Sequence, residues 1–363
     1  MPASGRRRNR RSTAAAVALT AGITAGAALL LSACGPNDPV ADPATAPTAN
    51  GSAAAAGSGS GKGSGKGADG SAQAPSATVS AKPAGSSATL NGTANNGLTI
   101  SDGTRYVVMN GTRVDFGTEV RDLAWSPNGA KAVFIDGDGD LAVSDPDGGG
   151  RVIAAKNPGG QTWSHPTWQI RPDYSDPDVR TNHLIFVVRS GGVSKLYRVP
   201  ATGQYATPKA LSLGSASGED AKPLPQTGNI WPNAAGNHGT SVYANSADGE
   251  VYIRDDYLRQ QGYQLTQGSE PALSPTPDQL DIVFVRSVGG HDHLFVEHSA
   301  DDGPVYKDLT PHATTDYTEP AWSPDGRTIA ARTADGVVTL PADGSRAPVK
   351  VSGYQGLPAY RTS

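Results

Sequence analysis

Two glutamates occupy matching positions in a repeated segment of the chain, and together they could take part in metal-dependent hydrolysis. Glu270 precedes a Pro-Ala pair, and so does Glu319. Acids that converge from several repeats can hold a metal ion, which then activates a water molecule. Two acids are few for such a site, and the sequence contains no Gly-x-Ser-x-Gly nucleophile motif. We therefore expect no catalytic residues, no bound metal and no cofactor.

Two other clusters contain side chains that ligate metals. An Asp stands at every second position from Asp136 to Asp140, as at the start of a calcium loop. Leu141 stands where that loop needs Gly, and Asp147 where it needs Glu, so the spacing favours a hairpin turn over a calcium site. The segment from His291 to His293 follows a Gly-Gly pair, which favours an exposed turn and leaves a weak transition-metal site as the alternative.

Cys34 is the only cysteine of the chain, so no intramolecular disulfide can form. It follows five arginines between positions 6 and 11 and an apolar run from Ala14 to Leu31, a pattern typical of an export signal. The four residues that end at Cys34, Leu-Ser-Ala-Cys, resemble the lipobox of bacterial lipoproteins. The resemblance implies removal of residues 1–33 as a signal peptide and diacylation of the Cys34 sulfur.

Two acyl chains hold a protein at a membrane where one does not. We therefore expect a lipid-anchored protein at the extracytoplasmic face of the cell membrane. The alternative is an uncleaved transmembrane helix with an incidental cysteine. The pair Arg10-Arg11 leaves the general secretory route and the twin-arginine route both open.

Residues 34–97 contain mainly Ala, Gly, Ser, Thr, Pro and Asn, with almost no large apolar side chain. Such a segment cannot bury enough surface to offset its ordering entropy, so we expect a disordered linker. Its rms reach is roughly 45 Å, from about 5–6 Å times the square root of the residue number. The linker would let a folded domain move around its membrane anchor.

The composition of the remaining chain excludes one class of partner. Gly and Pro account for 73 of the 363 residues, which favours short strands and turns over helices. Residues 98–363 carry 22 Lys and Arg against 31 Asp and Glu, a net charge of −9. Because nucleic-acid binding needs clustered basic residues, we expect no nucleic-acid partner.

Residues 98–363 contain a repeat. The segment Ala-Trp-Ser-Pro-Asn-Gly at 124–129 returns as Ala-Trp-Ser-Pro-Asp-Gly at 321–326. Weaker copies place one anchor residue in each repeat: Trp125, Trp168, Trp231, Leu273, Trp322 and Tyr360. These anchors are 43, 63, 42, 49 and 38 residues apart, and periods near 40–50 residues are typical of propeller blades.

Each repeat also contains short β-rich runs separated by Gly-containing turns, the pattern of an antiparallel meander. Three runs at 98–100, 105–109 and 112–116 lack an inner strand, and residues 357–361 can supply it. Pairing of the two ends would close the ring and remove free edges. We therefore predict an all-β, six-bladed β-propeller of four-stranded antiparallel blades, closed by its N- and C-terminal strands. Five or seven blades are the alternatives, if the 63-residue interval is split or merged differently.

The Pro-Ala-Trp-Ser-Pro-Asp-Gly segment at 320–326 and its looser copy at 122–129 resemble the repeat of TolB-type β-propellers. The resemblance covers roughly residues 98–363 and implies the propeller fold. TolB itself has an α/β domain before the propeller and works with a peptidoglycan-associated lipoprotein, whereas the linker takes that place here. The chain is therefore similar to the broader group of lipid-anchored proteins that carry TolB-like propellers.

In a propeller, the loops that lead into the innermost strands surround one mouth of the central channel. In this chain these loops carry aromatic and charged side chains that form a candidate binding rim: Arg121, Asp122, Trp163, His165, Glu270, Tyr317, Glu319 and Tyr354. The alternative is that these side chains pack between blades or cap turns. Trp125, Trp168 and Trp322 are expected to fill the wedges between blades.

A complete propeller without a catalytic motif favours a non-enzymatic, monomeric binding platform. The predicted anchor and tether make an envelope protein the expected partner. The alternative is glycan or small-molecule binding, or metal-dependent hydrolysis, at the mouth of the channel.

Overall fold

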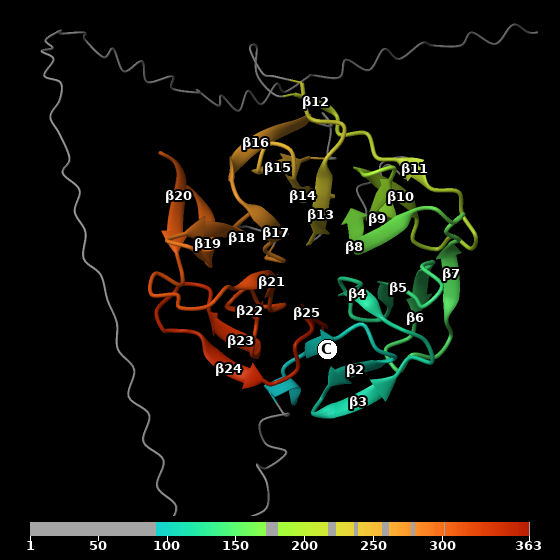
Figure 1. The fold of residues 1–363 in the computed structure, drawn as a ribbon, viewed down its shortest axis with the longest axis horizontal. Helices are drawn as coiled ribbons and strands as arrows, with labels where there is room; N and C mark the ends of the chain where they lie inside the picture. Colours follow the sequence, from blue (N-terminus) through green and yellow to red (C-terminus); the bar gives the residue numbers. More distant parts are fainter. Residues whose placement is uncertain are drawn as a thin grey trace, which may run out of the picture. The chain divides into compact units, whose positions relative to one another are not determined.

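The computed structural model describes residues 92–171, 181–216, 223–235, 239–255, 261–276, 280–300 and 302–362. The predicted signal peptide, Cys34 and most of the predicted linker lie outside these residues. The described chain forms six sheets arranged around one centre, which confirms the six-bladed propeller (Figure 1). Within the described part, no helix is long and apolar enough to cross a membrane.

The first three blades each contain four strands, which follow one another from the channel outward. Blade 1 contains β25 (Leu357–Tyr360), β1 (Leu98–Ser101), β2 (Tyr106–Met109) and β3 (Thr112–Asp115). Blade 2 contains β4 (Arg121–Trp125), β5 (Ala132–Ile135), β6 (Leu141–Ser144) and β7 (Val152–Ala155). Blade 3 contains β8 (Thr162–Arg171), β9 (Thr181–Ser190), β10 (Val193–Pro200) and β11 (Lys209–Ala210).

The other three blades follow the same order, with one addition. Blade 4 contains β13 (Asn229–Ala234), β14 (Ser241–Asn245), β15 (Glu250–Arg254), β16 (Gln261–Gln267) and a fifth strand, β12 (Ser215–Ala216). Blade 5 contains β17 (Ser269–Leu273), β18 (Ile282–Val288), β19 (His291–Ala300) and β20 (Gly303–Asp308). Blade 6 contains β21 (Thr318–Trp322), β22 (Thr328–Thr333), β23 (Gly336–Pro341) and β24 (Val349–Ser352).

The ring closes through its two ends, as the sequence predicts. β1 pairs antiparallel with β25, and Leu98 lies opposite Tyr360. Thr99 ties this closure to the next blade, because its Oγ1 donates a hydrogen bond to the Ala359 carbonyl and accepts one from Trp125 Nε1, both at 2.9 Å. The pairing removes the free edge that each terminal strand would otherwise expose.

The predicted wedge tryptophans are buried, which confirms their structural role. Trp125, Trp168 and Trp322 are 8 %, 6 % and 8 % exposed. Each packs in a hydrophobic cluster with residues of the preceding blade, as Trp168 does with Val133 and Ile135 of blade 2. Trp322 also donates from Nε1 to the Ala272 carbonyl at 2.9 Å, which joins blade 6 to blade 5. The repeat therefore supplies both the packing and the bonds between blades.

The acidic run at 136–140 forms the turn between β5 and β6. The Gly139 amide donates to the Asp136 carbonyl at 3.0 Å, and Gly139 has φ of 82°. Asp136 Oδ1 accepts the amides of Asp138 and Asp140, each at 3.0 Å. This carboxylate therefore caps its own turn, as the hairpin interpretation predicts.

The histidine pair lies partly in a different environment from the expected exposed turn. The turn is formed by the preceding Gly-Gly pair, and His291 and His293 begin β19. His293 is only 5 % exposed, and its Nδ1 lies 2.9 Å from Asp308 Oδ2. The expectation of an exposed turn is therefore wrong for His293, because this strand residue points into the blade and not out of the turn.

Candidate binding site in the central channel

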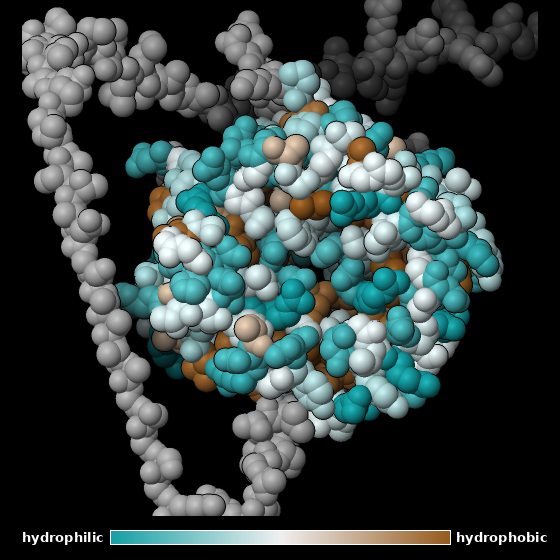
Figure 2. Space-filling model, in the orientation of Figure 1, coloured by the Kyte–Doolittle hydropathy of each residue, from teal (hydrophilic) through white to brown (hydrophobic). Residues whose placement is uncertain are grey.

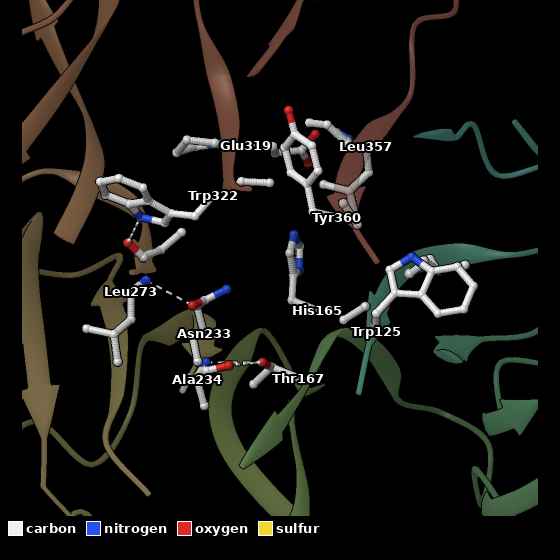
Figure 3. Close-up of a pocket in the computed structure, with 18 of the residues that line it drawn as sticks. Trp125, His165, Thr167, Asn233, Ala234, Leu273, Glu319, Trp322, Leu357 and Tyr360 are labelled. Atoms are coloured by element: carbon white, nitrogen blue, oxygen red, sulfur yellow. Dashed lines mark hydrogen bonds between the residues drawn. The ribbon is translucent and has the colours of Figure 1, made fainter. Parts of the chain in front are cut away.

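A cavity of about 370 Å³ lies on the propeller axis and is lined by the inner strands of all six blades. Each inner strand contributes the residue that stands three positions before its anchor position. We call these residues the channel ring: Asp122, His165, Trp231, Glu270, Glu319 and Leu357. Figure 3 shows His165 pointing into the middle of the cavity, with Glu319 and Leu357 on one side.

Five of the six channel-ring residues have a left-handed backbone. Their φ angles lie between 48° and 55°, and Leu357 is the exception. In each of these five strands the pairing with the next strand shifts at this residue, as a β-bulge requires, whereas β25 pairs without a shift. A left-handed non-glycine residue costs roughly 1–2 kcal/mol. Bulges re-aim a side chain, and here they act at five equivalent places around one channel.

The acidic side of the channel ring joins blades 5 and 6. Glu270 Oε2 accepts the backbone amide of Glu319. Glu319 Oε2 in turn lies 3.0 Å from Arg332 Nε on β22. Burial raises the pKa of Glu270, although the Glu319 amide and the Arg332 charge act in the opposite direction. Burial also raises the pKa of Glu319, with Arg332 opposing the shift and the charge of Glu270 adding to it.

The opposite side of the channel ring joins blades 2, 3 and 4. Asp122 Oδ2 accepts the His165 amide at 3.0 Å, and the same oxygen lies 3.9 Å from His165 Nδ1. The His165 ring meets the Trp231 ring edge to face, with centroids 6.0 Å apart and an interplanar angle of 82°. Side chains from three blades are therefore in mutual contact around the cavity.

A second layer of contacts holds the inner strands together below the channel ring. Thr167 Oγ1 accepts the Ala234 amide at 3.1 Å, and Asn233 Oδ1 accepts the Leu273 amide at 2.9 Å (Figure 3). These bonds join blade 3 to blade 4 and blade 4 to blade 5. Because each uses a side chain of one inner strand and the backbone of the next, they fix the spacing between strands and hence the width of the channel.

The structure places four of the eight predicted rim residues together and the other four elsewhere. Asp122, His165, Glu270 and Glu319 all line the cavity. The remaining four lie outside the cavity lining: Arg121, Trp163, Tyr317 and Tyr354.

Those four residues make contacts within or between blades. Arg121 Nη2 donates to the Asp136 carbonyl at 3.0 Å. Trp163 is 3 % exposed, and its ring centroid lies 4.9 Å from that of Phe186. Tyr317 and Tyr354 are half-buried and pack on the hydrophobic clusters of blades 5 and 6 and of blades 1 and 6.

Two residues of the channel ring, Trp231 and Leu357, are absent from the predicted rim. Trp231 is an anchor by the sequence pattern, but in the structure it lines the cavity and Ala234 stands at the anchor position. The residue after Trp231 is Pro232, which corresponds to the proline after His165, Glu270 and Glu319. Alignment on this proline instead of on the aromatic residue would have identified Trp231.

The chemistry of the cavity is that of a polar binding site with aromatic walls. Hydrophilic side chains gather around the mouth seen in Figure 2. Three carboxyl groups, from Asp122, Glu270 and Glu319, can accept hydrogen bonds from a ligand, and Trp231 offers an apolar face. Among the described residues, no three His, Cys, Asp or Glu side chains lie close enough together to hold a metal ion.

The chain matches no protein-family model and no curated protein. It is similar to the crystal structure of TolB from Acinetobacter baumannii, with a TM-score of 0.50, 15 % identity and coverage of 73 % of this chain and 65 % of that chain. It is also similar to the β-propeller domain of Myceliophteria thermophila Cps50 (Swd1), with a TM-score of 0.45, 10 % identity and coverage of 74 % and 88 %. The chain thus spans 65 % of the length of TolB, and the likeness concerns the fold.

Proposed function

We propose that this chain is a lipid-anchored protein of the extracytoplasmic face of the cell membrane, and that its TolB-like propeller binds an envelope protein at the central channel. The anchor is diacylated Cys34, and the segment up to residue 97 acts as a tether. The protein acts by binding and not by catalysis. The observation that carries the proposal is the channel ring, in which five equivalent residues adopt a costly backbone to surround one cavity.

The energetics of the channel ring support a binding role. Structural stability alone would favour an extended backbone and apolar side chains at these strand positions. Instead, burial raises the pKa values of Glu270 and Glu319, so their ionised forms oppose folding at neutral pH. Groups that reduce stability and converge on a cavity are typical of functional sites.

A second candidate function is the binding of a small polar ligand or a glycan inside the channel. The cavity itself favours it, because a volume of about 370 Å³ lies within the usual size range of small-molecule pockets. The carboxyl groups of Glu270 and Glu319 would accept hydrogen bonds from amine or hydroxyl groups. Metal-dependent hydrolysis at the same two glutamates stays a prediction.

The test is crosslinking in cells that express the full chain, followed by mass spectrometry of the captured proteins. The double variant Glu270→Gln/Glu319→Gln removes both charges but keeps side chains of similar shape. We expect one dominant envelope protein with the unaltered chain and at least a tenfold loss with the double variant. Asp147→Asn/Asp343→Asn is the matched control, because it removes two exposed carboxylates from the turns between the outer strands of blades 2 and 6, which do not line the cavity.

The Cys34→Ala chain separates anchoring from binding. Without lipid attachment the chain should stay unprocessed, and capture of a membrane-bound partner should fall. Equal capture by the unaltered chain and the channel double variant would refute binding at the channel. Saturable binding of a sugar or amine ligand with no protein captured would favour the second candidate function.

A further inference from the structure

The charges of the propeller are unevenly distributed. Residues 98–363 carry a net charge of −9, yet residues 181–216 contain no Asp or Glu and four Lys or Arg. These residues form β9, β10, β11 and β12 and the turns between them. In Figure 1, β10 and β11 lie on the outer edge of blade 3, away from the channel.

The four basic residues of this segment form what we call the basic rim: Arg189, Lys195, Arg198 and Lys209. Arg189, Lys195 and Lys209 are exposed, and Arg198 is half-buried. Arg198 and Lys209 lie directly opposite each other across β10 and β11, where like charges repel. Four basic residues on other blades have acidic partners: Arg105, Lys131, Arg151 and Arg332. Among the described residues, no carboxylate forms an ion pair with the basic rim.

Two apolar side chains accompany the basic rim. Val193, at the start of β10, is 46 % exposed, and Tyr205, in the turn between β10 and β11, is 69 % exposed. The backbone of this turn is held against blade 2, because the Tyr205 amide donates to the Ile153 carbonyl at 3.0 Å and the Ala206 amide to the Ala154 carbonyl at 2.8 Å. Tyr205 is thus presented to solvent from a fixed turn with φ of 49°.

We propose that the basic rim docks on an anionic membrane surface, with Tyr205 and Val193 in the headgroup layer. The proposal rests on the membrane anchoring in the proposed function. Lys and Arg near an anionic leaflet are attracted to it, and tyrosine is enriched at membrane interfaces. A lipid surface is the best fit because the charges are spread over the three outer strands of the blade, of which β10 spans roughly 25 Å at about 3.3 Å per residue and β11 forms the outer edge.

The tether makes weak docking sufficient. A lipid anchor keeps the propeller within reach of the membrane, so that docking becomes an intramolecular step at high effective concentration. Contact through the outer edge of blade 3 also places the channel axis parallel to the membrane surface. Both mouths of the channel then stay open, so docking is compatible with binding of a partner at the channel ring.

The experiment measures binding of a chain that begins at residue 34 and carries Cys34→Ala, so that it has no lipid. The vesicles contain either phosphatidylcholine alone or phosphatidylcholine mixed with anionic phosphatidylglycerol. We expect co-sedimentation with the anionic vesicles only, and a steep loss as salt is raised. Removal of one charge should weaken binding about fivefold, so Lys195→Ala/Arg198→Ala/Lys209→Ala should weaken it on the order of 100-fold.

Matched variants on other blades separate docking from general charge effects. Arg327→Ala/Arg346→Ala/Lys350→Ala removes three exposed basic residues from blade 6 and should change binding less than threefold. Tyr205→Ser should weaken binding several-fold, whereas Tyr263→Ser, at a residue that is 50 % exposed on blade 4, should not.

Three results would overturn the proposal. The first is that the chain does not bind anionic vesicles, and the second is that the two triple variants lose vesicle binding equally. The third is that soluble polyglutamate displaces the chain from the vesicles while Tyr205→Ser leaves vesicle binding unchanged. The last result would identify an acidic polymer as the ligand. Because the assay uses a chain without lipid, its failure leaves the anchoring at Cys34 intact, and a failure of anchoring leaves this result intact.

Discussion

Thr99→Val tests the closure of the ring at a single atom. Thr99 is 2 % exposed, and its hydroxyl joins three strands: its own strand β1, the Ala359 carbonyl of β25 and Trp125 Nε1 of β4. Valine has nearly the same shape, so the substitution removes both hydrogen bonds and leaves little void. The Trp125 N–H group then remains buried without a partner, since its ring is 8 % exposed.

The expected loss follows from these contacts. Removal of a hydrogen bond costs about 1 kcal/mol, and an unpaired buried donor costs about 1–3 kcal/mol. We therefore expect Thr99→Val to lower the free energy of unfolding by roughly 3 kcal/mol. In a domain of this size that corresponds to a decrease in Tm of about 6–12 °C, measurable by calorimetry or urea denaturation.

Thr99→Ser is the matched control, because it keeps the hydroxyl and loses only a methyl group, worth about 1 kcal/mol. The valine variant should be clearly less stable than the serine variant. If the two variants unfold at the same temperature, the hydroxyl does not hold the ends of the propeller together, and the closure must depend on the strand pairing alone.

Three further predictions concern the channel, the C-terminus and the anchor. Because burial raises the pKa of Glu270, its ionised form destabilises the fold at neutral pH, and this penalty disappears as pH falls through the raised pKa toward the ordinary value of 4.5. Glu270→Gln should therefore raise Tm at pH 7, and thermal melts across pH should show the gain vanishing in acid; a gain that is independent of pH would contradict this. At Gly129, with φ of 66°, a Cβ would clash with the Thr362 carbonyl, whereas at Gly159, with φ of 88°, it would meet open space. Gly129→Ala should thus cost clearly more than the roughly 1–2 kcal/mol of left-handed strain expected for Gly159→Ala, and equal urea midpoints would refute the packing of the C-terminus on blade 2. Cys34→Ala should leave the precursor uncleaved, and unchanged gel mobility together with unchanged membrane association would refute the lipoprotein assignment.

The sequence predicts the architecture because propeller turns have strict chemical needs. Glycines in the hairpins adopt positive φ, as Gly139 does at 82° and Gly336 at 131°, and few other residues replace them there. The spacing of these turns and of the wedge tryptophans along the sequence therefore predicts the number of blades. The unpaired strands at the N-terminus also predict the closure, since a blade without its inner strand must obtain it from the other end of the chain.

The channel ring was less predictable, because it depends on backbone geometry that no residue type specifies. Asp, His, Trp and Glu all occupy the left-handed position, so side-chain chemistry gives no common pattern. The assignment of Trp231 as an anchor was wrong because an aromatic residue is typical of both positions. Trp163 is adjacent to the channel loop in sequence, yet it is buried against Phe186, because the bulge turns neighbouring side chains to different sides.

The fifth strand of blade 4 was also not predicted. β12 contains only Ser215 and Ala216, and neither residue type favours strands. Its pairing with β16 is parallel, with Ser215 opposite Gln261. Ser215 and Ala216 form a strand because they pair with β16 at the edge of blade 4. The partner residues are far away in the sequence, so the two residue types alone do not predict the pairing.

The central claim is that the channel ring binds the partner, and photocrosslinking from defined positions tests it most directly. A photoreactive amino acid would replace Leu357 in the channel ring or, in separate chains, Tyr263 or Lys350 on the outer parts of blades 4 and 6. All chains would keep Cys34 and be irradiated in cells. Binding at the channel predicts that the channel position captures one envelope protein and that the outer positions do not. Capture from the outer positions, with none from Leu357, would contradict it.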